Sequence, residues 1–100
     1  MARERVAAVA EIPPGRAKTC MAGGKALAVV NLDGKFHAID NTCVHRGGPL
    51  GEGAVDGNSL ICPWHGWQFD LSTGECTTNP AVRVGCYEVS VDGDEVYVEV

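Results

Sequence analysis

The pattern of hydrophobic and polar positions along the chain is that of short β-strands. In the C-terminal segment CYEVSVDGDEVYVEV, apolar residues fall at every second position on both sides of Asp92-Gly93. A period of two is typical of a strand with one buried face, and an Asp-Gly pair is a common hairpin turn. The face predicted to lie in the core consists of Tyr87, Val89, Val91, Val96, Val98 and Val100.

The N-terminal half predicts a similar arrangement of strands and tight turns. The segment KALAVVNL is apolar nearly throughout, which favours a strand buried on both faces. Asp33-Gly34 follows it and predicts a second hairpin. No segment shows convincing helical periodicity, and 13 glycines indicate many turns. The predicted strands are Val6–Val9, Arg16–Met21, 25–32 and 35–40.

The segment 41–81 has a different composition from the rest of the chain. It is rich in Gly, Pro, Cys, His and Trp, and it contains only two short strand candidates, Ser59–Ile61 and Trp67–Asp70. A length of 100 residues indicates one domain. We therefore predict a single all-β domain, in which a framework formed by residues 1–40 and 82–100 carries a loop-rich binding subdomain at 41–81.

Charge and cysteine content narrow the classes of partner and of site. The chain has 13 acidic and 8 basic residues, a net charge of −5, and no Lys or Arg from residue 84 to 100. This distribution argues against nucleic acid or an anionic membrane as partner. No stretch resembles a signal peptide or approaches the roughly 20 apolar residues of a spanning helix, so we expect a cytoplasmic protein. An odd number of cysteines indicates reduced thiols or metal ligands: Cys20, Cys43, Cys62, Cys76 and Cys86.

Two short Cys/His pairs are the candidate ligands of a metal site. Cys43 and His45 are separated by one residue, and Cys62 and His65 by two, with sixteen residues between the pairs. Glycines beside both pairs allow the backbone to approach a negatively charged centre closely, and prolines stiffen the loops. The residues expected to support these loops are Arg46, Gly47, Gly48, Pro49, Pro63, Trp64 and Gly66.

Zinc and a binuclear iron centre are the two alternatives for this ligand set. Zinc fingers usually pair two cysteines and then two histidines on a helix, whereas each pair here is mixed and no helix is predicted. A mixed pair on each loop suits two irons, one bound by thiolates and the other by imidazoles. A cysteine nucleophile with a histidine base would use only one pair and leave the other unexplained.

The two boxes CVHRGGPL and CPWHGWQFD, with the turn TGE and the segment Asn79-Pro80-Ala81, resemble the Rieske ferredoxins. The chain is most similar to the ferredoxin components of bacterial ring-hydroxylating dioxygenase systems. The resemblance implies an antiparallel β-sandwich or barrel and one [2Fe–2S] cluster. In it, Cys43 and Cys62 would bind one iron and His45 and His65 the other, while Pro80 would belong to a third loop over the cluster.

The resemblance also implies a function. The chain would be an electron carrier rather than an enzyme, passing single electrons from a flavin-dependent reductase to a terminal aromatic-ring-hydroxylating oxygenase. Docking would be transient and would occur at the histidine end of the cluster, where Pro49, Leu50, Pro63 and Trp64 would form an apolar collar. Alternatives are the small subunit of an assimilatory nitrite reductase and a structural zinc module. An oxygenase would need a further mononuclear iron site, for which only His37 remains.

Differences from the high-potential members of this family predict a low redox potential. Those proteins have two additional cysteines that form a disulfide, and a Ser and a Tyr that donate hydrogen bonds to the cluster. The corresponding positions are Gly48 and Trp64 for the cysteines, and Trp67 and Phe69 for the hydroxyl donors. Hydrogen bonds to sulfur stabilise the reduced state. We therefore expect a midpoint potential at the low end of the Rieske range, about −150 mV.

Overall fold

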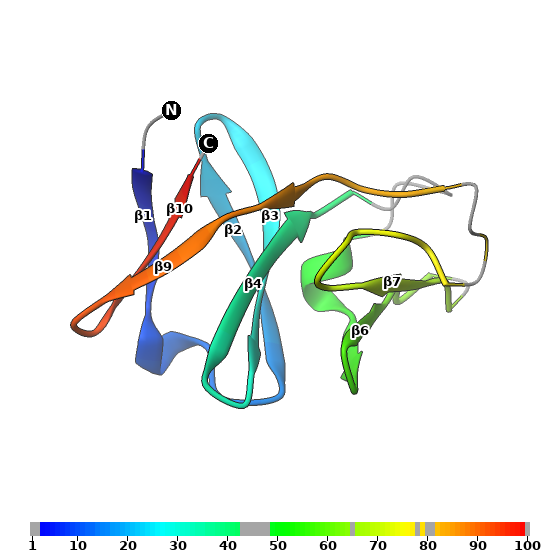
Figure 1. Cartoon of the computed structure of the whole chain (residues 1–100), viewed down its shortest axis with the longest axis horizontal. Helices are drawn as coiled ribbons and strands as arrows, with labels where there is room; N and C mark the ends of the chain where they lie inside the picture. The colour runs from blue at the N-terminus through cyan, green and yellow to red at the C-terminus, as the bar shows by residue number, and fades with distance from the viewer. Residues whose placement is uncertain (1–2, 43–48, 65, 78, 80–81, 100) are drawn as a thin grey trace.

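The computed structural model describes residues 3–42, 49–64, 66–77, 79 and 82–99. These residues form three antiparallel sheets (Figure 1), which confirms the all-β prediction. None of the helices in this described part is long and apolar enough to cross a membrane. The largest sheet has the strand order β2-β3-β4-β8, formed by Arg16–Ala22, Lys25–Leu32, Lys35–Asp40 and Cys86–Tyr87.

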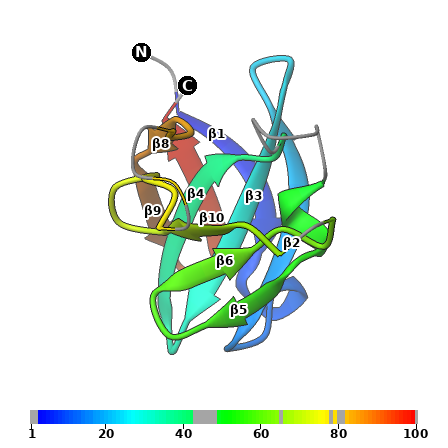
Figure 2. The same ribbon diagram turned by 90° about the vertical axis from the view of Figure 1, so that its right-hand side faces the viewer.

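The other two sheets have three strands each. One has the order β1-β10-β9 and consists of Arg3–Ala8, Glu95–Glu99 and Val89–Asp92. The other has the order β5-β6-β7 and consists of Ala54–Asp56, Ser59–Ile61 and Gln68–Asp70. It lies between β4 and β8 along the chain and stands to one side of the remaining strands in Figure 1 and in front of them in Figure 2. Two short 3-10 helices, η1 (Val9–Glu11) and η2 (Leu50–Glu52), complete the described elements.

Strand β3 separates two hydrophobic clusters. Its side chains alternate between them, because successive residues of a strand point to opposite faces. Ala28 and Val30 belong to the cluster shared with the β5-β6-β7 sheet, and Leu27 and Val29 belong to the cluster shared with β1 and β10. All four are fully buried. This confirms the prediction that the strand is buried on both faces.

The predicted turn at Asp33-Gly34 joins β3 to β4. Both residues have positive φ, 52° and 95°, as a tight hairpin turn requires. The buried side chain of Asn31 braces this turn, since its Nδ2 donates to the Ile12 carbonyl at 2.8 Å and its Oδ1 accepts from the Gly34 N–H at 2.7 Å. The Asp92-Gly93 turn, also predicted, joins β9 to β10.

Several details of the fold differ from the sequence-based prediction. Tyr87 was expected on one strand with Val89 and Val91, but Cys86–Tyr87 form the separate strand β8, which pairs with β4 rather than with β10. Val100, also predicted for the core face, lies outside the described residues.

Strand β1 begins at Arg3 rather than Val6, because Arg3, Glu4 and Arg5 already pair with β10 in antiparallel register. Ion pairs from Arg3 to Asp92 and from Arg5 to Glu95 accompany this pairing. Val91 is 47% exposed, since β9 is the edge strand of its sheet and only part of its apolar face is covered. The three-residue strand β5 was not predicted.

Candidate metal centre

One of the four predicted ligands, Cys62, lies within the described part of the chain. Cys43, His45 and His65 lie outside the described residues. Of the supporting residues, Pro49, Pro63, Trp64 and Gly66 are described, whereas Arg46, Gly47, Gly48 and Pro80 are not. The described residues therefore define the bases of the predicted ligand loops rather than the ligand set itself.

The base of the first ligand loop is closed on both sides. Thr42 and Pro49 form an antiparallel bridge across the segment 43–48. Next to this bridge, the Leu50 N–H donates to the Asn41 carbonyl at 2.7 Å, and the Gly51 N–H donates to Asn41 Oδ1 at 2.7 Å. The segment that contains Cys43 and His45 thus starts and ends at one fixed point.

The second ligand loop is closed in the same manner. The Cys62 N–H donates to the Trp67 carbonyl at 2.7 Å, and this bond closes the base of the connection between β6 and β7. Gly66 has a φ of 72°, a conformation that favours glycine and explains its place beside His65. Pro63 and Trp64 are exposed on this connection, Trp64 by 49%.

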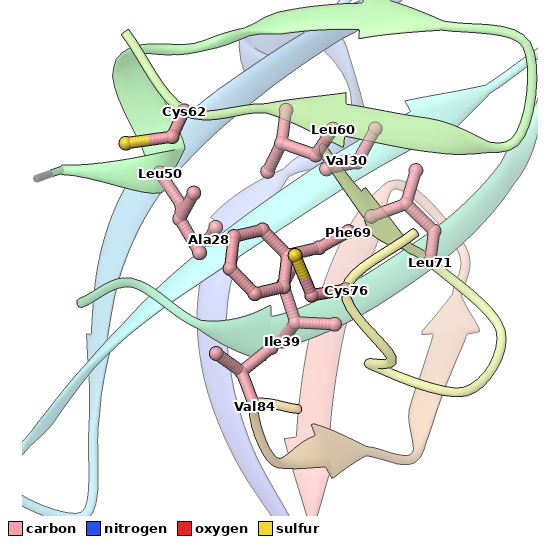
Figure 3. Close-up of a cluster of buried hydrophobic side chains, with 10 residues drawn as sticks. All are labelled: Ala28, Val30, Ile39, Leu50, Leu60, Cys62, Phe69, Leu71, Cys76 and Val84. Atoms are coloured by element: carbon pink, nitrogen blue, oxygen red, sulfur yellow. The ribbon is translucent and has the colours of Figure 1, made fainter. Parts of the chain in front are cut away.

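Cys62 itself is almost completely buried, with 1% of its surface exposed. It belongs to the same hydrophobic cluster as Leu50 and Cys76 (Figure 3). Leu50 follows the first ligand loop and Cys76 precedes the third, so the bases of all three loops meet at this cluster. A cysteine sulfur shielded from water at the junction of these loops is a donor that fits a metal–sulfur centre.

The burial of Leu50 corrects one prediction. Leu50 was expected to form an exposed apolar collar with Pro49, Pro63 and Trp64, but its side chain is 0% exposed. The first turn of η2 directs it into the core beside Cys62 (Figure 3), while Pro49 is half-buried. The exposed apolar surface among the described residues of this end is therefore provided mainly by Pro63 and Trp64.

The third loop, predicted from Asn79-Pro80-Ala81, is anchored on β7. The Thr77 N–H donates to the Gln68 carbonyl at 2.8 Å, and the Cys76 N–H donates to the Val82 carbonyl at 2.9 Å. The Asn79 N–H lies 3.4 Å from Cys76 Sγ, which accepts its hydrogen bond. Cys76 is therefore a buried core residue whose sulfur also contacts the third loop.

A polar clamp lies immediately before the first ligand loop. Asp40 ends β4, and its carboxylate accepts hydrogen bonds from the Tyr87 hydroxyl at 2.5 Å and from the Gly85 N–H at 2.8 Å. The bond to Asp40 is the main cause that raises the pKa of Tyr87 to about 12. Sequence reasoning missed this clamp, because Asp40 and Tyr87 are far apart along the chain and neither belongs to a motif.

The remaining cysteines and histidine have structural positions. Cys20 is buried in the cluster around β1 and β10, and burial raises the pKa of its thiol. Cys86 is exposed. His37 is half-buried on β4, and burial is the main cause that lowers its pKa. Among the described residues, no group of three His, Cys, Asp or Glu side chains could hold a metal ion.

Comparison with known protein families gives one matching description. The profile of the family described as "Rieske [2Fe-2S] domain" matches residues 2–88. Among curated proteins, "Ferredoxin CarAc" from Metapseudomonas resinovorans is 38% identical over 96 residues, covering 94% of this chain and 90% of its own length.

Solved structures of the same shape include both ferredoxins and a reductase subunit. The ferredoxin of carbazole 1,9a-dioxygenase from Nocardioides aromaticivorans IC177 superposes with a TM-score of 0.90 and 33% identity, covering 98% of this chain and 97% of its own. A chain from a complex of reduced oxygenase and oxidised ferredoxin in carbazole 1,9a-dioxygenase has a TM-score of 0.85 and 36% identity, with coverages of 96% and 91%. A putative NADH-dependent nitrite reductase small subunit from Mycobacterium tuberculosis has a TM-score of 0.91 and 25% identity, with coverages of 97% and 93%.

Proposed function

Because the chain belongs to the Rieske [2Fe–2S] domain family, we propose that it is the ferredoxin component of a ring-hydroxylating dioxygenase system. It carries one [2Fe–2S] cluster, which supplies a one-electron redox couple, and it acts as an electron carrier rather than as a catalytic enzyme. The observation that supports this role most strongly is the similarity to such ferredoxins over 94% of this chain and 90% of the relative's length.

We assign the cluster ligands from the sequence pattern and the loop bases. Cys43 and Cys62 supply the thiolates, and His45 and His65 supply the imidazoles. Burial of Cys62 at the junction of the loops and closure of both loop bases by backbone hydrogen bonds support this assignment. The segment 41–81 is, on this assignment, the cluster-binding subdomain of the single domain.

The proposed partners are a terminal oxygenase and a flavin-dependent reductase. A related chain, 36% identical, belongs to a complex with an oxygenase, which supports the first of these partners. Docking takes place at the end that carries Pro63 and Trp64, the exposed apolar residues beside the second ligand loop. Electron-transfer contacts are small, usually below about 1,200 Å², so the complexes are transient. A cytoplasmic location is consistent with this role.

The small subunit of an assimilatory nitrite reductase is the second candidate function. The observation that favours it is the similarity of shape to the Mycobacterium tuberculosis protein. The identity of 25% is lower than the 33% and 38% found with the ferredoxins. Two measurements would separate the candidates. A ferredoxin should reduce a ring-hydroxylating oxygenase in solution, as measured by the rate of electron transfer. A nitrite reductase subunit should instead copurify with its large subunit.

The presence and potential of the cluster can be tested on the purified protein. We expect two irons and two sulfides per chain, a visible spectrum that dithionite bleaches, and a midpoint potential of about −150 mV. A colourless protein containing zinc would contradict the proposed function. A midpoint potential above zero would leave the cluster in place but refute the low-potential assignment.

A further inference from the structure

We infer that Asn41 is a positioning residue whose side-chain carbonyl holds the first ligand loop in the geometry that retains the cluster. This inference rests on the proposed function, in which Cys43 and His45 are ligands. Asn41 lies outside both sequence boxes and is not among the predicted site residues. It is nevertheless one of two buried polar residues in the described part of the chain, with 8% of its surface exposed.

The main chain and side chain of Asn41 connect three separate segments at the base of the loop. Its N–H donates to the Ala26 carbonyl at 3.1 Å, and its carbonyl accepts from the Leu50 N–H at 2.7 Å. Its Oδ1 accepts from the Gly51 N–H at 2.7 Å and from the Thr19 hydroxyl at 3.0 Å. Asn41 follows the end of β4, and the start of β3, the start of η2 and the middle of β2 therefore meet at this one residue.

Only an oxygen acceptor at position 41 satisfies the two donors that converge there. The bond between Asn41 Oδ1 and the Gly51 N–H is buried, so removal of the acceptor would leave this N–H without a partner. The orientation of the amide follows from the same bond, because a backbone N–H must face the oxygen rather than the nitrogen of the side chain.

The packing between Gly51 and this oxygen is too close for a side chain at position 51. A Cβ atom at Gly51 would lie 2.8 Å from Asn41 Oδ1 and 2.6 Å from the Thr19 backbone nitrogen. Both distances are shorter than ordinary contacts allow, so η2 can approach β2 closely only with glycine at this position. The side-chain oxygen of Asn41 thus holds Gly51, which follows the first ligand loop, close to β2.

Asn31 provides a matched control within the same protein. It is the other buried polar residue of the described part, 3% exposed, and its side chain also makes two hydrogen bonds, in this case both to backbone groups. It braces the hairpin at the start of β4, whereas Asn41 follows the end of β4. Loss of Asn31 should therefore reduce stability without affecting the ligand loop.

The test compares Asn41→Ala, Asn41→Asp and Asn31→Ala in the cluster-containing protein. The rate of cluster loss is followed by visible absorbance, EPR spectra of the reduced samples are recorded, and thermal unfolding of each variant is measured in parallel. We expect Asn41→Ala to lose its cluster about tenfold faster than the wild type or more, with broadened EPR signals. Asn41→Asp retains the oxygen acceptor and should restore near wild-type behaviour, and Asn31→Ala should lower the unfolding temperature with an unchanged EPR spectrum.

Equal rates of cluster loss for Asn41→Ala and Asn31→Ala would overturn the inference, as would an Asn41→Asp variant as labile as Asn41→Ala. If Asn41→Ala does not fold, Thr19→Val removes only the hydroxyl donor to Asn41. It should accelerate cluster loss by a smaller factor, and no acceleration would count against the inference. A wild-type protein that binds no cluster would refute the proposed function itself, an outcome distinct from these.

Discussion

Phe69 belongs to the hydrophobic core and also occupies the position where high-potential family members have a tyrosine that donates a hydrogen bond to the [2Fe–2S] cluster. Its side chain is fully buried in the cluster that also contains Cys62 and Leu50 (Figure 3). A phenylalanine there fills space without presenting a hydroxyl donor. This agrees with the low potential expected from the sequence, because each hydrogen bond to a cluster sulfur stabilises the reduced state.

The variant Phe69→Tyr should raise the midpoint potential, as measured by potentiometric titration, because it introduces a hydroxyl donor near the proposed ligand Cys62. It should also lower the free energy of unfolding by about 1–3 kcal/mol if part of the hydroxyl's hydrogen bonding is unsatisfied. Phe36→Tyr is the control, since Phe36 packs against the other hydrophobic cluster. An equal rise of the potential in both variants would refute the specific effect of position 69.

The hydrogen bond between Tyr87 and Asp40 should make the free energy of unfolding depend on pH. The hydrogen bond to Asp40 raises the pKa of Tyr87 to about 12, above its ordinary value of about 10, so the folded state favours the neutral hydroxyl. The stabilisation is therefore complete below a pH of about 10 and is lost as pH rises towards about 12. Urea unfolding across this range should show the loss in the wild type and a weaker one in Tyr87→Phe. In Tyr97→Phe the Asp40–Tyr87 bond remains, so the wild-type loss should persist.

At the scale of elements, the hairpins were predictable and the loop bases were not. Asp33-Gly34 and Asp92-Gly93 are local signals, and each occurs at the turn that it predicted. The closure of the first ligand loop depends instead on Thr19, Asn41 and Gly51, which belong to different elements and have no shared pattern. Such contacts form only when β2 and η2 come together in the folded structure, so the spacing of residues along the chain does not predict them.

The same limit explains the differences at Leu50 and β5. Leu50 follows a motif proline and lies among glycines, so the sequence did not distinguish an exposed collar from a core position. The turn of η2 determines its direction. Strand β5 has three residues, and its pairing with β6 rather than its own composition defines it. The two Cys/His boxes, in contrast, predicted the location of the loops because the spacing of metal ligands is a local property.

Substitution of Gly51 tests the approach of η2 to β2. A methyl group in Gly51→Ala would collide with the Thr19 backbone and with Asn41 Oδ1, which should cost about 1–3 kcal/mol of unfolding free energy and promote cluster loss. Gly24→Ala is the comparison, since its Cβ would meet nothing within 4 Å and only its positive φ would cause strain. Urea unfolding and visible absorbance measure the two effects. Cluster retention in Gly51→Ala equal to that in Gly24→Ala would contradict the role of this contact.

At the scale of the whole molecule, the exposed Trp64 distinguishes the proposed docking end from the rest of the surface. Trp64→Ala should slow electron transfer to a partner oxygenase by about tenfold, because exposed aromatic residues contribute strongly to small interfaces. The midpoint potential should change little. Met21→Ala removes another exposed apolar side chain, from β2, and should leave the rate unchanged. Stopped-flow measurements would decide, and equal rates for Trp64→Ala and wild type would refute docking at this position.

The division of the core by β3 has a consequence for how the molecule opens. Among the described residues of the segment 41–81, none belongs to the hydrophobic cluster around β1 and β10, whereas the other hydrophobic cluster includes Leu50, Leu60 and Phe69. Local opening events follow such boundaries between buried groups. Backbone amides of β1 and β10, which pack against the hydrophobic cluster without residues from 41–81, should therefore keep slow hydrogen–deuterium exchange after the iron is removed. Amides of β6 and β7 should exchange quickly. The molecule would thus respond to metal loss as two cooperative units that share one strand.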